Sequence, residues 1–470
     1  MRGVRHGHLH GLDPIIPRRS VQVHSAEWAK RPGKPPLFDH HPSDMTDPAS
    51  QGSAACPHRP VTPDAAPPPS MHNYDVIILG AGAAGLFCAG LAGQRGLRVL
   101  LIDHASKVAE KIRISGGGRC NFTNSHTSAA NFISDNPKFC RSALSRYTPA
   151  DFLALLQRHG IAFHEKHLGQ LFCDQSSELV IQMLLAECDA GGVERWQPCQ
   201  VHEVRPDDAG FALSTDRGPA RAAQLVVATG GLSIPKIGAT DFGYRLARQL
   251  GHQVVPTRPA LVPLVFDAAS WPHQAALAGV SLPVHIQTGS GRAKGQFSED
   301  LLFTHRGVSG PAILQASSYW LPGQPLLIDL LPGQNARTWL DDAKSLSKRQ
   351  LGNELGSKLP QRLAEHWLAG LGLDAQRTMP QCRDRDLQTL AEALQRWNIT
   401  PAGTEGYRKA EVTAGGVDTR ELDSRHLGSL RVRGLHFIGE VLDVTGWLGG
   451  YNFQWAWASA AACAQALSKT

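Results

Sequence analysis

Apolar and polar residues follow different periods in successive parts of the chain. Tyr74 to Leu79 is a nearly continuous apolar run rich in branched residues, which is typical of a parallel strand covered on both faces. A small-residue segment from Ala84 to Arg95 predicts a helix, and Leu97 to Ile102 predicts a second strand. This order of strand, helix and strand predicts an α/β fold with a parallel sheet.

The pattern changes further along the chain. From about Val255 to Leu331, short alternating runs are broken by proline, glycine and serine, which favours an antiparallel barrel or sandwich. Asn335 to Thr400 then predicts several helices. Nearer the N-terminal side, Glu194 to Arg205 and Gly210 to Thr215 predict a β-hairpin layer, and the segment 149–190 predicts helices.

The first 70 residues show little apolar periodicity and are rich in proline, histidine, serine and arginine. Such a composition buries too little apolar surface to offset the entropy of ordering, so we expect a disordered arm. It lacks the apolar centre of a signal peptide. Met71 lies just before the first strand, which suggests that natural translation starts there.

Gly80, Gly82 and Gly85 form a G-x-G-x-x-G turn directly after the first predicted strand. The first glycine allows the sharp turn, the second lets a pyrophosphate approach the backbone, and the third lets helix and strand pack closely. Asp103 follows the second strand, where an acid accepts hydrogen bonds from the two adenosine ribose hydroxyls. Because a carboxylate there disfavours a 2′-phosphate, the turn predicts FAD or NAD rather than NADP.

A second glycine-rich stretch, Lys107 to Asn121, follows Asp103 with the sequence KVAEKIRISGGGRCN. We expect a loop whose exposed amides bind an anion, with a plain flexible loop as the alternative. A later Ala-Thr-Gly-Gly turn, which includes Thr229 and Gly230, follows a buried strand and lets the chain pass a cofactor closely. No second strand, glycine, helix, strand and acid unit occurs, so a separate NAD(P)H domain is missing.

The text K-I-x-I-S-G-G-G-R-C-N-x-T-N at 111–124 resembles the BaiN/YhiN-like flavoproteins, and the resemblance extends over roughly residues 73 to 465. It implies a Rossmann-like two-layer FAD-binding domain with inserted β-barrel-like and helical domains. The implied boundaries are 71–254 and 406–470 for the FAD-binding domain, 255–334 for the barrel-like domain and 335–405 for the helical domain. Val201 is implied to lie near the adenine.

The chain returns to the cofactor in its last sixty residues. Glu440 follows a predicted strand at the position where FAD domains bind a ribitol hydroxyl, and the segment 449–452 begins the final helix, where amides can stabilise a reduced flavin. The candidate cofactor-binding residues are Gly80, Gly82, Ala83, Ala84, Gly85, Asp103, Lys111, Ser115, Gly116, Gly117, Gly118, Arg119, Cys120, Asn121, Val201, Thr229, Gly230, Gly439, Glu440, Gly449, Gly450, Tyr451, Asn452 and Phe453.

Two residues are candidates for catalysis. His305 lies in the sequence THRGVSGP, which matches the family's T-H-x-G-x-S-G-P signature; it is a candidate proton donor, and a histidine that holds its loop by hydrogen bonds is the alternative. Cys120 lies in the glycine-rich loop with no partner cysteine nearby in sequence. We therefore expect a packing or electronic role rather than a redox-active disulfide.

Composition narrows the class of protein. The net charge of +6 has no lysine-arginine block, so we expect a small-molecule substrate and no nucleic-acid partner. No apolar run approaches the roughly 20 residues of a membrane span. The 9 cysteines show no C-x-x-C pair and no metal-ligand spacing, which indicates reduced thiols in a cytoplasmic protein, no metal site and no disulfide reductase.

Together these patterns predict an FAD-dependent oxidoreductase. We expect hydride transfer through flavin N5, with NADH or NADPH as the transient reductant and a small organic compound as the substrate, for example one with a conjugated C=C bond. A non-enzymatic flavin-binding redox sensor and a flavin-dependent RNA-modifying enzyme are the alternatives. The oligomeric state stays open.

Overall fold

A computed structural model describes residues 71–469, apart from 268–270, 272–273 and 292–293. The arm predicted for residues 1–70 lies outside the described residues. Within the described part of the chain, no helix combines the length and the apolar character needed to cross a membrane.

The first sheet has seven strands in the order β7-β2-β1-β10-β9-β8, with β20 paired to β10. Five of them, β7, β2, β1, β10 and β20, run parallel, and β9 and β8 continue the sheet antiparallel. The strands are β1 (His72–Leu79), β2 (Val99–Ile102), β7 (Glu194–Trp196), β8 (Val201–Asp207), β9 (Gly210–Thr215), β10 (Gly218–Val227) and β20 (Leu435–Phe437). The parallel half is apolar because both of its faces are covered.

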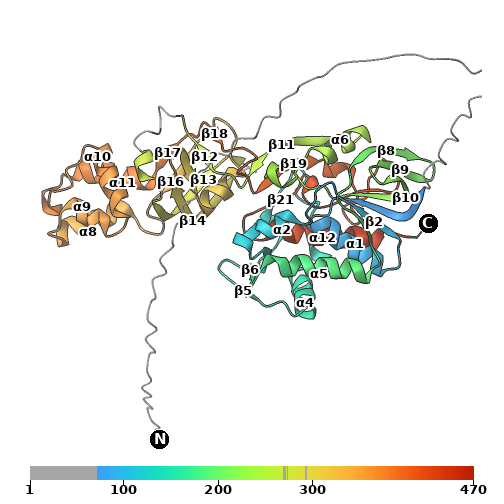
Figure 1. Cartoon of the computed structure of the whole chain (residues 1–470). Helices are drawn as coiled ribbons and strands as arrows, with labels where there is room; N and C mark the ends of the chain where they lie inside the picture. Colours follow the sequence, from blue (N-terminus) through green and yellow to red (C-terminus); the bar gives the residue numbers. More distant parts are fainter. Residues whose placement is uncertain (1–70, 268–270, 272–273, 292–293, 470) are drawn as a thin grey trace, which may run out of the picture. The chain divides into compact units, whose positions relative to one another are not determined.

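Helix α1 (Ala83–Gln94) packs against α5 (Ser177–Ala190) and α12 (Tyr451–Ala466), and the three helices lie together beside this sheet (Figure 1). Small residues allow the close approach: a Cβ at Gly93 would lie 2.5 Å from the carbonyl oxygen of Gly191. The other helices of this region are α2 (Glu110–Ile114), α3 (Arg141–Arg146), α4 (Pro149–Arg158) and α6 (Phe242–Gln249).

Three small sheets connect these layers. One contains β3 (Asn121–Asn124), β6 (Gln170–Cys173) and β5 (Phe163–Glu165), and the two others pair β11 (Val254–Ala260) with β19 (Val412–Val417) and β21 (Thr445–Gly446) with β4 (Phe132–Ile133). Short 3-10 helices occur at Ser115–Gly118, Ala129–Asn131, Pro235–Ile237, Gln274–Leu277, Met379–Gln381, Thr419–Glu421 and Gly439–Val441.

The second large sheet is antiparallel, with seven strands in the order β17-β16-β13-β14-β15-β12-β18. Its strands are β12 (Leu264–Val265), β13 (Ser281–Thr288), β14 (Gly295–Phe303), β15 (Gly307–Ser309), β16 (Leu326–Asp329), β17 (Trp397–Ile399) and β18 (Gly403–Thr404). Helix α7 (Pro311–Ser317) contacts β13, β14 and β15. Four further helices follow β16: α8 (Ala336–Leu346), α9 (Leu351–Gly356), α10 (Gln361–Gly370) and α11 (Asp384–Gln395).

Two hydrophobic clusters correspond to the two large sheets. One surrounds the parallel strands and α1, α5 and α12, and the other joins the antiparallel sheet to helices α7 to α11. Trp447 is partly buried and packs against both clusters. This side chain therefore links the two halves of the described structure.

Several predicted elements differ from the structure. Glu194 to Trp196 does not join the predicted hairpin layer but forms the parallel edge strand β7 beside β2, because the hairpin begins only at Val201. The segment after Ala109 forms α2 and a 3-10 helix rather than a loop. The antiparallel sheet takes β17 and β18 from the range predicted as helical. The domain boundaries themselves stay predictions.

Candidate active site

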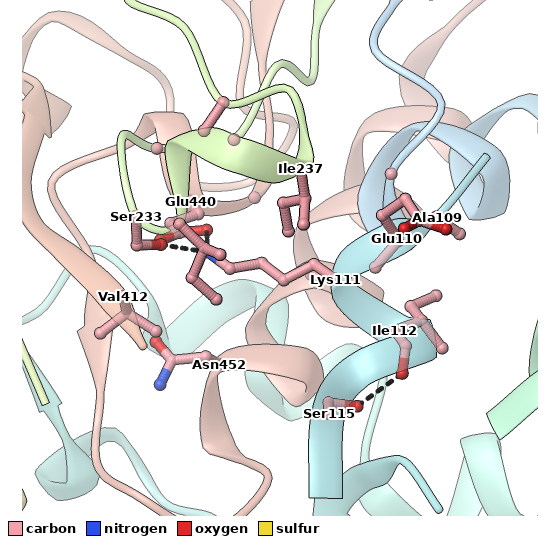
Figure 2. Close-up of a pocket in the computed structure, with 18 of the residues that line it drawn as sticks. Ala109, Glu110, Lys111, Ile112, Ser115, Ser233, Ile237, Val412, Glu440 and Asn452 are labelled. Atoms are coloured by element: carbon pink, nitrogen blue, oxygen red, sulfur yellow. Dashed lines mark hydrogen bonds and ion pairs between the residues drawn. The ribbon is translucent and has the colours of Figure 1, made fainter. Parts of the chain in front are cut away.

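A cavity of about 860 Å³ extends from the turn between β1 and α1 to strand β14 of the antiparallel sheet. The first turn of α12, the turn between β5 and β6, the segment 228–231 and helix α2 also line it. Figure 2 shows a part of this cavity around Lys111, Ser233 and Glu440. The two ends of the cavity are built in different ways.

The β1–α1 turn forms one end. Gly80 has φ +106°, and a Cβ at Gly85 would lie 1.8 Å from the carbonyl oxygen of Gly80. Gly82 has no protein atom within 4 Å of its Cβ position, so it faces open cavity. Ala83 and Ala84 also line the cavity, and the first-turn amides of a helix have no intrahelical partners. The turn is shaped to receive an anionic group at the start of α1.

Asp103 lies beside this turn, directly after β2. Its carboxylate accepts hydrogen bonds from the Ala81 amide at 2.6 Å and the Ala105 amide at 2.8 Å. These bonds fix the carboxylate at the cavity wall. A carboxylate has about four lone-pair sites, so it can also accept from ligand hydroxyls.

Lys111, on α2, reaches across the cavity to the far wall. Its Nζ lies 2.6 Å from Glu440 Oε2 and 2.6 Å from Ser233 Oγ, as Figure 2 shows. Glu440 Oε1 accepts from the Thr413 amide at 2.9 Å. In the structure the Glu440 carboxylate forms an ion pair with Lys111. Its predicted contact with a ribitol hydroxyl stays a prediction.

The start of α12 contributes Gly449, Gly450, Asn452 and Phe453 to the cavity. A Cβ at Gly450 would lie 2.2 Å from the Thr123 carbonyl oxygen. When the Asn121 amide is oriented to satisfy its neighbours, its oxygen accepts from the Gly450 amide at 3.2 Å. Gly450 is therefore needed to pack against the protein's own backbone, which the sequence did not indicate.

The other end of the cavity combines side chains from distant segments. Gln315 on α7 donates to Glu299 Oε1 at 3.1 Å, and its own oxygen accepts from the Leu448 amide at 2.9 Å. Trp447 donates from Nε1 to the Tyr319 hydroxyl at 2.7 Å. Glu299, Trp447 and Leu448 line the cavity, together with Lys166, His167 and Gln170 from the β5–β6 turn.

Glu299 is not among the candidates predicted from the sequence, although the pattern of its strand is informative. In β14, Gly295, Phe297, Leu301 and Phe303 are buried, and Glu299 occupies the same face of the strand. An acid in an otherwise apolar period-two pattern is the kind of position that a functional requirement explains. Burial raises the pKa of Glu299 above its ordinary value, and the Gln315 hydrogen bond and His167 oppose that shift.

Most predicted cofactor-binding residues line the cavity, including Asp103, Lys111, Ser115, Gly116, Gly117, Asn121, Val201, Thr229 and Gly230. Among the described residues, Gly85, Gly118, Arg119, Cys120 and Tyr451 do not line it. Gly85 lies beneath the turn, and Tyr451 is buried beside Phe132 and Trp447. Direct contact predicted for these five residues is therefore not supported by their positions.

Cys120 is fully buried behind the cavity wall. It has φ +50°, and burial raises the pKa of its thiol while a hydrogen bond with Ser115 opposes the rise. A buried neutral thiol is a poor nucleophile. Cys120 is not among the residues that line the cavity, and the expected packing role fits its position. The eight cysteines in the described residues are all buried and none forms a disulfide.

His305 also lies away from the cavity. It is exposed in the turn between β14 and β15, where the Thr304 amide donates to the Gly307 carbonyl oxygen at 2.8 Å. This backbone hydrogen bond closes the turn between the two strands, and the His305 side chain takes no part in it. His305 is not among the residues that line this cavity, so its role as a proton donor stays a prediction.

The comparison with protein families decides the family. The model of the HI0933-like protein Rossmann domain matches residues 74–466 of this chain. The chain belongs to the HI0933-like Rossmann-domain family. This confirms the resemblance to BaiN/YhiN-like flavoproteins and the predicted α/β, FAD-binding Rossmann fold.

Curated relatives of this HI0933-like chain match over nearly their whole length. A ribosomal RNA dihydrouridine synthase of Escherichia coli (strain K12) is 51% identical over 398 residues, covering 84% of this chain and 98% of the relative. The protein of the same name from Haemophilus influenzae is 47% identical with the same coverage. A 3-dehydro-bile acid delta(4,6)-reductase of Clostridium scindens is 28% identical over 81% of this chain and 96% of the relative.

These relatives correct one expectation. The even charge distribution predicted a small-molecule substrate and no nucleic-acid partner, yet two relatives near half identity are named for ribosomal RNA. Net charge was a poor guide because phosphate contacts can come from a few local cations. Lys166 is one such cation, and it is exposed and lines the cavity.

The cavity of this HI0933-like protein fits a flavin dinucleotide. An added Cβ at Gly82 would project into open cavity, whereas one at Gly85 would overlap the backbone. Residues from the β1–α1 turn, Asp103, α2 and the start of α12 share one continuous wall. This arrangement suits a long ligand with an anionic centre and hydroxyl-bearing ends.

Proposed function

We propose that this protein is an FAD-dependent ribosomal RNA dihydrouridine synthase that reduces the C5=C6 bond of a uridine base. The observation that carries the proposal is the match of 51% identity over 98% of the length of a curated ribosomal RNA dihydrouridine synthase. The C5=C6 bond of uracil is conjugated to a carbonyl group, so the proposed reaction keeps the predicted chemistry and changes the substrate.

The bile acid reductase supports the same reaction class. That relative is named for reduction in a 3-dehydro compound, although it is only 28% identical. Two relatives with different substrates then share one flavoprotein family. The proposal for RNA rests on the higher identity of the dihydrouridine synthases.

When bound, FAD supplies two-electron hydride chemistry. In our proposal the β1–α1 turn binds its pyrophosphate, and Asp103 binds an adenosine ribose hydroxyl. Lys111 and Glu440, paired at 2.6 Å, orient the middle of the cofactor. The first-turn amides of α12 would stabilise negative charge on a bound flavin.

The substrate base is proposed to enter at the end lined by Gln170, His167 and Glu299. Exposed Lys166 at this end suits a phosphate backbone, because a cation there attracts RNA without reading its sequence. A base must leave its stack to reach a cavity of this kind. We propose that the reaction takes place in the cytoplasm and that NADH or NADPH reduces the flavin.

The direct test uses purified holoprotein under anaerobic conditions. The RNA is ribosomal RNA from cells that lack the corresponding enzyme, and each reaction contains NADH or NADPH. We expect dihydrouridine at one position, detected by mass spectrometry of RNA fragments, and flavin reoxidation only when RNA is added. Transcribed RNA without structure and a 3-keto steroid enone serve as comparison substrates.

Gly82→Val is the matched control variant, because its side chain would project into the open part of the cavity. We expect it to fold, to contain no FAD and to form no dihydrouridine. Reduction of the enone without reduction of RNA by the wild-type protein would contradict the proposed function. Flavin that stays fully reduced with every RNA would contradict it as well.

A further inference from the structure

Glu299 is placed at the substrate end of the cavity by two independent features. Strand β14 presents it on the face shared with buried Phe297 and Leu301, where it is half-buried and lines the cavity. Gln315 then fixes the carboxyl group, with its Nε2 3.1 Å from Glu299 Oε1. Gln315 is itself buried and tied to the Leu448 amide. The carboxyl group is thus held in one orientation at the cavity wall.

The surroundings favour the protonated form of this carboxyl group. The hydrogen bond from Gln315 occupies one oxygen, which leaves the other oxygen available for a proton directed into the cavity. The titratable groups that influence Glu299 are His167 on the β5–β6 turn and Asp300 on its own strand, and Glu299 in turn raises the pKa of Tyr451 on α12. Burial is the largest influence, and it raises the pKa of Glu299.

We propose that Glu299 is the catalytic acid of the reaction, the group that delivers a proton to the uracil carbon that does not receive the hydride. This inference rests on the proposed function. Reduction of a C=C bond needs one hydride and one proton. A carboxylic acid that touches the base from the side of the antiparallel sheet supplies the proton without a metal or a thiol.

The step balances as follows. C6 of uracil, the carbon β to the C4 carbonyl, receives a hydride from the reduced flavin. The electrons of the C5=C6 π bond form a new C–H bond at C5 with the proton of Glu299, whose O–H bond breaks. The products are a saturated C5–C6 bond, an oxidised flavin and a Glu299 carboxylate, which regains a proton from water.

No other acid on the described cavity wall combines these features. Asp103 is held by two backbone amides at the β1–α1 end of the cavity, and Glu440 is paired with Lys111. Glu110 is paired with Arg113. Glu411 lies in the segment next to Val412, beside the Lys111 and Glu440 pair rather than at the β14 end. His305 and Cys120, the residues that sequence alone suggested, do not reach the cavity.

The experiment compares Glu299→Gln, Glu299→Asp and Asp300→Asn. Asp300→Asn makes the matching carboxyl-to-amide replacement at the neighbouring, exposed position of β14, so it is the matched control. Each holoprotein is assayed in two halves by stopped-flow absorbance of the flavin: reduction by NAD(P)H, then reoxidation by ribosomal RNA. Affinities for FAD and for RNA are measured separately.

We expect Glu299→Gln to bind FAD and RNA as the wild type does and to be reduced at the same rate. Its reoxidation by RNA should slow by about 10²- to 10⁴-fold, the range for loss of a general acid. Glu299→Asp should recover part of that rate. In the wild type, reoxidation should slow as pH rises through the raised pKa of Glu299, and this dependence should be absent from Glu299→Gln and retained in Asp300→Asn.

A second measurement does not depend on turnover. Because Glu411 and Asp443 also have raised pKa values, the infrared spectrum of Glu299→Gln is subtracted from the others. The carbonyl band of a protonated carboxylic acid that remains in the wild-type and Asp300→Asn difference spectra should persist above the ordinary titration range of glutamate. Wild-type protein that forms no dihydrouridine overturns the proposed function, and this band then still decides the state of Glu299. The assignment of Glu299 as the acid is overturned if the band is lost in the ordinary titration range of glutamate. It is also overturned if RNA reoxidises the flavin of Glu299→Gln as fast as that of the wild type.

Discussion

The two ends of the cavity differ in how the chain builds them. The cradle end comes from one continuous unit, β1, the turn at Gly80 and Gly82, α1 and β2, and its polar contacts are mostly backbone amides. The substrate end combines the β5–β6 turn, β14, α7 and the segment before α12. Its polar contacts are side chains such as Glu299 and Gln315.

This difference separates what is shared from what can vary. A backbone cradle recognises a dinucleotide through amides that any sequence with the right glycines provides. A substrate end made of side chains can change its specificity by single substitutions without loss of the cofactor. Relatives named for ribosomal RNA and for a bile acid within one set of matches agree with this division.

The largest expected effect comes from a substitution inside the β1–α1 turn of the cradle end. In Gly85→Ala, the new Cβ would lie 1.8 Å from the Gly80 carbonyl oxygen, and the backbone of the turn cannot move without disturbing β1. We expect the apoprotein to lose more than about 4 kcal/mol of unfolding free energy, measured by urea denaturation. The FAD content after purification should fall with it.

Gly82→Ala is the matched control, since nothing in the described structure lies within 4 Å of its new Cβ. Its apoprotein should unfold at the same urea concentration as the wild type while its affinity for FAD falls. A large loss of apoprotein stability in Gly82→Ala would mean that the two glycines do not have separate roles in packing and in ligand approach.

A smaller effect follows pH and concerns the sheet that carries the cradle. His436 on β20 is buried, and burial lowers its pKa to about 4. The folded pKa lies below the unfolded value of 6.5, so the unfolded chain binds more protons between those values. Stability from neutral His436 is therefore complete above about pH 6.5 and decreases as pH falls to about 4, by about 3 kcal/mol in all.

The measurement is the unfolding free energy of the wild type and of His436→Gln between pH 4 and pH 7. Groups with raised pKa values, such as Glu299 and Asp443, change stability in the opposite direction, but they contribute equally to both proteins. We expect the difference between the two to vary with pH in this window. If the difference is constant with pH, the pKa of His436 is not lowered in the folded protein, and the prediction fails.

The sequence predicted the cradle and missed the substrate end for a physical reason. Gly80, Gly82, Gly85 and Asp103 have roles that follow from the short spacing of strand, turn and helix, and three of them line the cavity as expected. Glu299 and Gln315 meet Leu448 only through the packing of α7 and β14 against the last segment of the chain. No local pattern encodes that meeting.

The two catalytic candidates from the sequence, His305 and Cys120, do not line the cavity. His305 and Cys120 were selected because reactive residue types occur inside glycine-rich text. In the structure the glycines before Cys120 form a 3-10 helix and the Cys120 side chain is buried, while His305 is exposed between β14 and β15. A family motif marks a conformation as readily as it marks a catalytic side chain.

The smallest expected effect tests the link between the two ends. Trp447 packs against both hydrophobic clusters and donates to the Tyr319 hydroxyl at 2.7 Å. Trp447→Phe and Tyr319→Phe each remove this hydrogen bond, so a double-mutant cycle should give a coupling of about 1 kcal/mol in unfolding free energy. The same cycle on FAD affinity should give a smaller coupling, because the cradle binds its ligand through its own backbone. Equal coupling in both measurements would show that the Trp447–Tyr319 contact sets the cradle as well, and the division between a local end and an assembled end would fail.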